Sequence, residues 1–193
     1  MSRVFAQASM SLDGFVAGAG ETGFEHLFDW CGNGDVEIRV ADVERTYRVS
    51  AASADHVLDM LDGTGAIVVG RRQYDVTNGW NGRHPSGAPV FVLTHRAPPE
   101  PVPGFTFVTT GIVDAVERAR AAAGDRDVGI GPGTVVGQAL DAGLVDELRI
   151  DLVPVLLGDG VRLTGTLGKT PVVLGTPRVV EGRNVTHLSY ALA

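Results

Sequence analysis

The chain has 193 residues, a net charge of −7, 44% hydrophobic and 20% charged residues, which is typical of a globular protein with a sizeable core. Its basic residues are scattered, so we expect neither nucleic acid nor an anionic membrane as a partner. Cys31 is the only cysteine, so an internal disulfide is not expected. The sequence shows no apolar leader and no apolar run long enough to span a bilayer, and we therefore expect a cytoplasmic protein. Residues 1–193 are expected to form a single domain.

The first part of the chain is expected to contain two strands and two helices. Residues 4–10 read as a strand, followed by the turn Ser11-Leu12-Asp13-Gly14 and a short apolar return over 15–17. Helical spacing of apolar residues predicts a helix over 24–31, with Asp29 and Trp30 on its polar side. Residues 32–52 show no sustained period. Ser53 is the expected N-cap of a helix that ends at Leu61.

From residue 66 onward, strands and helices alternate. We expect strands over 66–69, 90–94, 105–109, 128–130 and 148–157, and helices that begin at 70, 112 and 134. The helix over 112–123 should bury Val113, Val116 and Ala119. Two final strands are expected over 171–180 and 185–192, and the turn 181–184 between them predicts a hairpin. The alternation predicts an α/β fold with a mostly parallel sheet, and the hairpin adds antiparallel pairing at one edge.

Residues 127–160 contain the most informative turn of the sequence. The strand ending at Ile130 leads into Gly131-Pro132-Gly133, and a helix begins near Thr134. A glycine-rich turn before a helix brings bare N–H groups to the positive end of the helix dipole, which suits a phosphate. The alternative is a tight turn between strand and helix that binds nothing.

Three strand ends carry related features: Gly70-Arg71-Arg72, Thr94-His95-Arg96 and Gly131–Thr134. The carboxyl ends of parallel strands meet at one edge of a sheet, so these ends should converge on one crevice. Glycine at a helix start suits a pyrophosphate, and the arginines suit the 2′-phosphate that distinguishes NADP from NAD. Each arginine taken alone also reads as a solvated surface residue.

The remaining candidate residues give weaker signals. Asp13 either caps its own turn or lies near a substrate, and Trp80 either stacks on a flat heterocycle or closes its loop over the core. No nucleophile elbow of the G-x-S-x-G type occurs. The five histidines show no metal-ligand spacing, so no metal site is expected: they are His26, His56, His84, His95 and His187.

Four segments in order resemble the dihydrofolate-reductase-like superfamily: SMSLDGFVA (9–17), GAIVVGRRQYD (65–75), PVFVLTHR (89–96) and the stretch over 129–163. The nearest branch looks like the C-terminal reductase domain of the bifunctional riboflavin-biosynthesis deaminase/reductase and its stand-alone relatives. The resemblance implies a three-layer fold and an NADPH-dependent reductase that transfers hydride to a C=N or C=O bond of a pterin- or pyrimidine-like small molecule. It also implies a homodimer.

The resemblance assigns roles by position. Gly70, Arg71 and Arg72 would hold cofactor phosphates; Thr94, His95 and Arg96 would meet the adenosine ribose and its 2′-phosphate; Ile130, Gly131, Pro132, Gly133 and Thr134 would pass beneath the pyrophosphate. The turn containing Asp13 would border the nicotinamide.

Two departures affect the substrate side of this assignment. The Leu-Pro-x-Asp type segment of dihydrofolate reductases is missing, as is the Asp-Asp-Pro type segment of the riboflavin reductases. Asp29 is a candidate for the substrate-binding carboxylate and proton donor; a solvent-facing structural Asp and an ordered water are the alternatives. A catalytically inactive nucleotide-binding or regulatory protein that keeps the NADP cleft is therefore a second hypothesis.

The Gly131–Pro132 bond carries a further prediction. Relatives have a cis Gly-Gly peptide here, and a cis bond costs about 2.5–4 kcal/mol between ordinary residues but only about 0.5–1 before proline. We therefore expect a cis Gly131–Pro132 bond, with the amides of Gly133 and Thr134 facing the bound phosphates.

Overall fold

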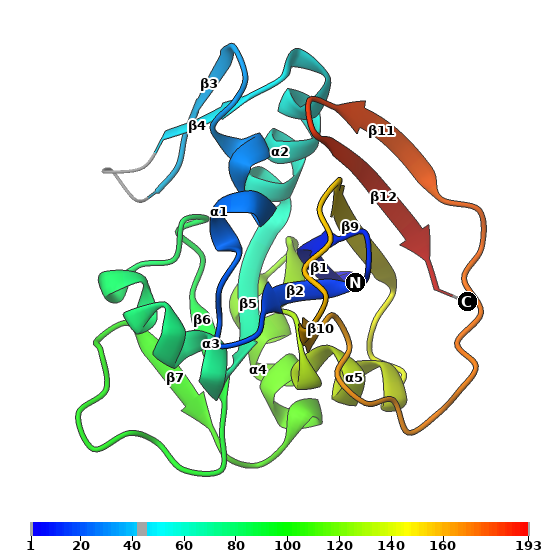
Figure 1. Ribbon diagram of the computed structural model, residues 1–193. Helices are drawn as coiled ribbons and strands as arrows, with labels where there is room; N and C mark the ends of the chain where they lie inside the picture. The colour runs from blue at the N-terminus through cyan, green and yellow to red at the C-terminus, as the bar shows by residue number, and fades with distance from the viewer. Residues whose placement is uncertain (1, 42–45, 193) are drawn as a thin grey trace.

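The computed structural model describes residues 2–41 and 46–192, and its centre is an eight-stranded sheet (Figure 1). The sheet order is β11-β12-β9-β1-β8-β5-β6-β7. The sheet strands are β1 Val4–Ser11, β5 Thr64–Gly70, β6 Val90–Leu93, β7 Phe105–Val108, β8 Asp127–Ile130, β9 Glu147–Val153, β11 Arg178–Gly182 and β12 Val185–Ala191. The six strands from β9 to β7 are parallel, whereas β12 pairs antiparallel with both β9 and β11. The predicted mostly parallel sheet with an antiparallel C-terminal hairpin is confirmed.

The other elements are short apart from two helices. The helices are α1 Phe24–Leu27, α2 Ala51–Gly63, α3 Arg71–Val76, α4 Ile112–Ala123 and α5 Thr134–Asp141, with the 3-10 turns η1 Asp29–Cys31 and η2 Asn78–Gly82. Two small antiparallel pairs join β2 Phe15–Gly18 to β10 Gly160–Arg162 and β3 Val36–Arg39 to β4 Thr46–Val49. Among the described residues, no helix is long and apolar enough to cross a membrane.

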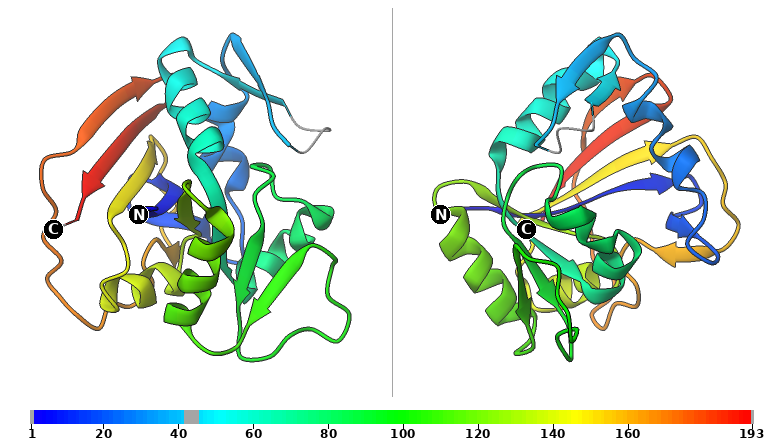
Figure 2. Two further views of the ribbon diagram at one scale, coloured as in Figure 1. Left: turned by 180° about the vertical axis from the view of Figure 1, so that it is seen from behind. Right: turned by 90° about the vertical axis from the view of Figure 1, so that its left-hand side faces the viewer.

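Helices cover both faces of the sheet and give the fold three layers (Figures 1 and 2). On one face, α4 and α5 pack their buried residues, such as Val116 and Val136, against Val68 and Ile130 of the central strands. On the other face, α2 and η1 share a cluster with Val153, while α3 packs Tyr74 against β5 and β6. The central strands are buried on both faces, which explains the unbroken apolar run of β5.

The expected helix over 24–31 is interrupted. It ends at Leu27, and Phe28 leaves helical geometry with φ −113° before the 3-10 turn begins. This break turns Trp30 inward, where it is buried and its indole N–H donates to the Ser9 hydroxyl at 3.0 Å. The prediction that Trp30 lies on the polar side is therefore wrong.

Other element boundaries also differ from the sequence predictions. Ser50 caps α2 by accepting the N–H of Ser53, so Ser53 is buried inside the helix rather than capping it. Val113 is half exposed, because Ala115 supplies the buried position on α4. Within 32–52 the described residues form the β3–β4 hairpin, and 42–45 lie outside the described residues.

Candidate cofactor and substrate site

The carboxyl ends of three neighbouring strands meet as the sequence predicted. β8, β5 and β6 are adjacent and parallel, with Ile130 opposite Val68 and Leu93 opposite Gly70. α3 begins directly after β5, and α5 begins three residues after β8. The guanidinium of Arg71 donates to the carbonyl of Arg96 at 3.0 Å, which joins the end of β5 to the segment after β6. Two helix starts and the arginine-bearing segments therefore share one edge of the sheet.

Glycine is required where these segments approach each other. A Cβ on Gly131 would lie 2.1 Å from Oε1 of Gln73 and 3.2 Å from Cγ1 of Val69, and a Cβ on Gly70 would lie 2.9 Å from Cγ2 of Val135. The Gln73 Oε1 atom is buried without a hydrogen-bond partner. Bare backbone and one unsatisfied acceptor thus lie at the junction of α3 with the turn after β8.

The turn after β8 differs from its prediction in two respects. Among the described residues the cis peptide bond is Thr170–Pro171, so Gly131–Pro132 is trans and the prediction of a cis bond is wrong. Backbone hydrogen bonds hold the turn on both sides of the proline. The N–H of Gly131 donates to the carbonyl of Val68 at 2.9 Å, and the N–H of Gly133 donates to the carbonyl of Leu163 at 2.7 Å. The Gly133 amide therefore donates to a protein carbonyl and is not free to bind a phosphate.

The free donors at this turn lie one residue later. Within the described residues, the amides of Thr134 and Val135 donate to no protein acceptor, and Thr134 is exposed. They belong to the first turn of α5, where the helix dipole favours an anion. The first turn of this helix is an anion-binding geometry even though the Gly133 amide is occupied.

The three arginines are not equivalent. Arg71 Nε contacts both carboxylate oxygens of Asp75 at 2.8 and 2.9 Å, and Arg72 Nε pairs with Glu21. The Arg96 side chain is exposed and makes no hydrogen bond or ion pair with the described residues. Its segment is fixed by Thr94, whose hydroxyl donates to the Arg96 carbonyl at 2.9 Å; His95 beside it is exposed. Of the three arginines, Arg96 is the one that could bind a phosphate without first breaking an ion pair.

Asp13 clamps two distant segments together. Its Oδ1 accepts the hydroxyl of Ser11 at 2.5 Å and the amide of Leu157 at 3.1 Å, and its Oδ2 accepts the amide of Gly158 at 2.7 Å. The Ser11 hydrogen bond is the main cause of a pKa lowered to about 2, with smaller contributions from these two amides against a burial effect that raises it. Asp13 therefore does more than cap its own turn, because it fixes the loop after β9.

Asp29 lies at a small pocket beside this loop. The pocket has a volume of about 350 Å³ and is lined by His26, Asp29, Val153, Pro154, Val155 and Asn184. Asp29 Oδ2 accepts a hydrogen bond from Asn33 at 3.1 Å. A carboxylate, an imidazole and apolar walls at the carboxyl end of β9 can bind a small polar heterocycle.

Trp80 does not line this pocket. Its ring stacks on Phe105 with centroids 6.3 Å apart and meets His84 edge-on at 4.7 Å. Trp80 lies in η2 with φ +46°, a left-handed conformation that is uncommon for a bulky residue. These contacts favour the alternative in which Trp80 closes its loop over the core.

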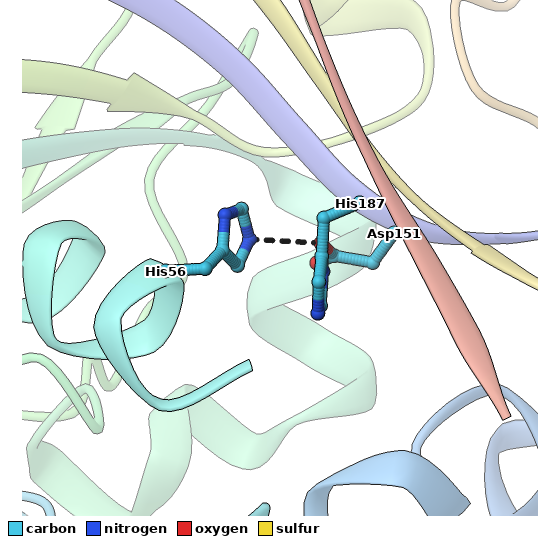
Figure 3. A group of neighbouring side chains, drawn as sticks. All are labelled: His56, Asp151 and His187. Carbon is cyan, nitrogen blue, oxygen red and sulfur yellow. Dashed lines mark hydrogen bonds and ion pairs between the residues drawn. The ribbon is translucent and has the colours of Figure 1, made fainter. Parts of the chain in front are cut away.

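Sequence reasoning missed a buried cluster formed by His56, Asp151 and His187 (Figure 3). Asp151 Oδ1 is 3.0 Å from His56 Nε2 and 2.7 Å from His187 Nδ1. Burial alone would raise the pKa of Asp151, but the hydrogen bonds with His187 and His56 lower it to about 2. The three residues come from α2, β9 and β12, so no sequence spacing signals the cluster.

With Ser53, the cluster has a serine–histidine–aspartate series of contacts, but it is not a hydrolase site. The Ser53 hydroxyl is 2.9 Å from His187 Nε2. Ser53 is buried, and a Cβ on Gly182 would lie 2.2 Å from its Oγ, so the hairpin covers the hydroxyl. A nucleophile without access to substrate cannot act in acyl transfer.

The sheet order, the antiparallel C-terminal pair and the convergent strand ends define a dihydrofolate-reductase-like α/β protein. Residues 2–181 match the model of the RibD C-terminal domain family, and the chain belongs to that family. This confirms the resemblance seen in the sequence. Among curated proteins, none matches this chain.

Solved structures share the fold at low sequence identity. A protein of Shewanella sp. PV-4 described as a riboflavin biosynthesis protein is 22% identical with a TM-score of 0.70, covering 100% of this chain and 99% of its own. A pyrimidine reductase-like protein of Corynebacterium diphtheriae is 17% identical with a TM-score of 0.63, covering 100% and 92%. Dihydrofolate reductase of Enterococcus faecalis, complexed with NADP(H), is 14% identical with a TM-score of 0.56, covering 98% and 96%.

Proposed function

We propose that this chain is an NADPH-dependent reductase that transfers hydride to a C=N or C=O bond of a pterin- or pyrimidine-like small molecule. Membership of the RibD C-terminal domain family supports an oxidoreductase of the pyrimidine reductase type. The observation that carries the proposal is that two kinds of free donor lie at the same edge of the sheet. These are the backbone amides at the start of α5 and the guanidinium of Arg96.

The residues present fit NADPH. The amides of Thr134 and Val135 would donate hydrogen bonds to the pyrophosphate. Arg96, with Thr94 and His95 beside it, would meet the 2′-phosphate. Gly70 starts α3 and places Arg71 and Arg72 at the rim, where they would exchange Asp75 and Glu21 for phosphate oxygens. When bound, the cofactor supplies the hydride.

The pocket that contains Asp29 would hold the substrate. Its apolar wall, Val153 to Val155, follows β9, and the Asp13 clamp fixes the loop that continues from it. The Asp29 carboxylate would accept ring N–H donors of a heterocycle and so orient it. Because Asp29 is held by Asn33, its position does not depend on a bound molecule.

Two measurements on the intact protein test this proposal. Calorimetry should show NADPH bound more tightly than NADH, and NADPH oxidation should occur with at least one member of a panel of pterins, pyrimidinones and small carbonyls. Asp29→Asn should lower turnover at unchanged NADPH affinity, whereas the exposed control Asp35→Asn should change neither. NADPH binding without turnover on any substrate would instead support the inactive nucleotide-binding alternative.

We further propose that residues 1–193 act as one cytoplasmic domain and that two copies pair through the β11–β12 end of the sheet. The pairing is supported by an exposed sheet edge that carries apolar residues.

A further inference from the structure

The His56–Asp151–His187 cluster gathers metal-ligand atoms from three elements into the interior. His56 comes from α2, Asp151 from β9 and His187 from β12, and their side chains are 6%, 4% and 1% exposed. One nitrogen from each imidazole and one oxygen of the carboxylate all lie within 4.8 Å of one another. Figure 3 shows His56 reaching from the helix towards the two strand residues, which lie side by side.

Polar groups around the cluster hold its side chains in one orientation. Ser53 Oγ is 2.9 Å from His187 Nε2, which leaves Nδ1 directed at Asp151. Gln7 Nε2 donates to Asp151 Oδ2 at 3.2 Å, which leaves Oδ1 for the two imidazoles. Outer partners of this kind orient the ligands in metal sites. Gln7 Oε1 is buried without a partner beside the carboxylate, so a further oxygen donor lies close by.

The donor set and its spacing suit a small divalent ion. Two imidazoles and a carboxylate are ligands of Zn²⁺, whose bonds of about 2.0–2.2 Å place neighbouring tetrahedral ligands about 3.4 Å apart. The separations of 3.0 and 2.7 Å from Asp151 Oδ1 to the two imidazole nitrogens would widen by about 0.4 and 0.7 Å on binding. Trp30 packs edge-on against His187 at 5.0 Å and shields the other side.

One residue of the cluster, His56, borders a cavity of about 970 Å³ near the amino ends of β1, β8 and β9, together with Met60, Arg149 and Ser189. A water molecule from this cavity would complete the coordination of a bound ion. Three protein ligands with one open position are a common zinc arrangement.

We propose that His56 Nε2, Asp151 Oδ1 and His187 Nδ1 bind one Zn²⁺ or a similar divalent transition-metal ion. The ion replaces the two imidazole N–H protons that otherwise point at the carboxylate. It joins α2 to β9 and β12, and so braces the antiparallel edge of the sheet. The site is independent of the proposed reductase activity, because none of its residues belongs to the cofactor cleft or the Asp29 pocket.

The test uses the full chain without a histidine tag, treated with a chelator and returned to metal-free buffer at neutral pH. Calorimetry should then show one Zn²⁺ per chain, and Co²⁺ should give the visible absorption of a tetrahedral nitrogen–oxygen site. At a free Zn²⁺ concentration of about 100 times Kd, the Tm should rise by about 5–10 °C. Wild-type protein that binds no stoichiometric ion and shows no change in Tm overturns the proposal and leaves a hydrogen-bonded cluster.

Variants localise the binding. His56→Ala should weaken Zn²⁺ binding at least about 100-fold, and Ser53→Ala, which removes only an outer partner, about 10–100-fold. His26→Ala removes an exposed histidine outside the cluster and should keep one Zn²⁺ per chain at unchanged affinity. Equal affinity in the wild type and His56→Ala would place any ion elsewhere and refute the site; should His56→Ala not fold, the Co²⁺ spectrum of the wild type and the Ser53→Ala titration decide.

Discussion

A single carboxylate, that of Asp13, holds the turn after β1 against a loop that follows 144 residues later in the chain. Its partners include the amides of Leu157 and Gly158, which donate to Oδ1 and Oδ2 of the carboxylate. The same loop leads from the wall of the Asp29 pocket to β10. The order of this loop thus depends on the charge state of one partly buried residue.

Replacement of Asp13 by Asn should reduce the acid sensitivity of the fold. The folded-state pKa of Asp13 is lowered from 3.8 to about 2, so the clamp contributes fully above pH 3.8 and is lost as the pH falls towards 2. Asp13→Asn should lower Tm near neutral pH, with a difference from the wild type that shrinks across this acid range. Asp125→Asn, at an exposed position outside the clamp, is the control. A Tm difference that does not change with pH would contradict the assignment.

Arg96 should set the preference for NADPH over NADH. A lost charge-assisted contact with a phosphate costs about 1.5–3 kcal/mol, so Arg96→Ala should weaken NADPH binding about 10- to 150-fold with little effect on NADH. Arg118→Ala, which removes a guanidinium paired with Asp114 on α4, is the control. Calorimetry with both cofactors measures the preference; an equal loss for NADPH and NADH would show that Arg96 does not meet the 2′-phosphate.

At the site, the sequence predicted which strand ends converge, but not which side chains are brought together where a helix packs on the sheet. The convergence of Gly70, Thr94 and Gly131 could be predicted because parallel strands end at one edge. The contact of His56 with Asp151 could not be predicted, because it depends on how α2 packs on the sheet. The prediction of a cis Gly131–Pro132 bond was wrong: the bond is trans, and backbone hydrogen bonds to Val68 and Leu163 hold the turn.

At the element scale, α5 and the segment after β10 form one packed unit. A Cβ on Gly137 would lie 2.3 Å from the carbonyl oxygen of Thr164 and 3.2 Å from that of Thr166. The Leu163 carbonyl in the same segment accepts the Gly133 amide. The first turn of α5, with its free amides, is therefore positioned by residues 163–166.

Substitution of Gly137 should disturb both stability and cofactor binding. The methyl group of Gly137→Ala would press against the backbone of the segment after β10, and such overpacking lowers the free energy of unfolding by about 1–3 kcal/mol. Urea unfolding measures the loss, and calorimetry should show weaker NADPH binding. Gly63→Ala is the matched control, since its Cβ meets nothing within 4 Å and its backbone is not left-handed. A Gly137→Ala protein as stable as the wild type would show that the segment moves without cost.

Element boundaries were predictable where one face is clearly apolar. The α4 helix matches its predicted range, because its apolar residues recur at helical spacing. The β3–β4 hairpin was not foreseen, since Ile38 is the only fully buried residue of β3 and its neighbours are charged. The last hairpin begins at Arg178 instead of 171, and Val173 in the unpaired stretch is 81% exposed.

At the scale of the whole molecule, β11, the outer strand of the C-terminal hairpin, forms one edge of the sheet. β9 lies between β1 and β12, whereas β11 ends the sheet and its Val179 is 50% exposed. An uncovered edge with apolar residues favours pairing with a second copy. Light scattering at micromolar concentration should give about twice the chain mass of 20.2 kDa, and Val179→Lys should shift it towards one copy. A wild-type mass of one chain would contradict the dimer.

The position of β1 in the sheet has a consequence for synthesis of the protein. β1 is made first, yet its two neighbours, β8 and β9, begin only at Asp127 and Glu147. At about 5–20 residues per second, the ribosome needs several seconds to deliver them. During that time the apolar strand at the N-terminus has no partner in the sheet and is open to chaperones. Pairing over such sequence distances is slow, so folding should be completed only after β9, and with it nearly the whole chain, has emerged.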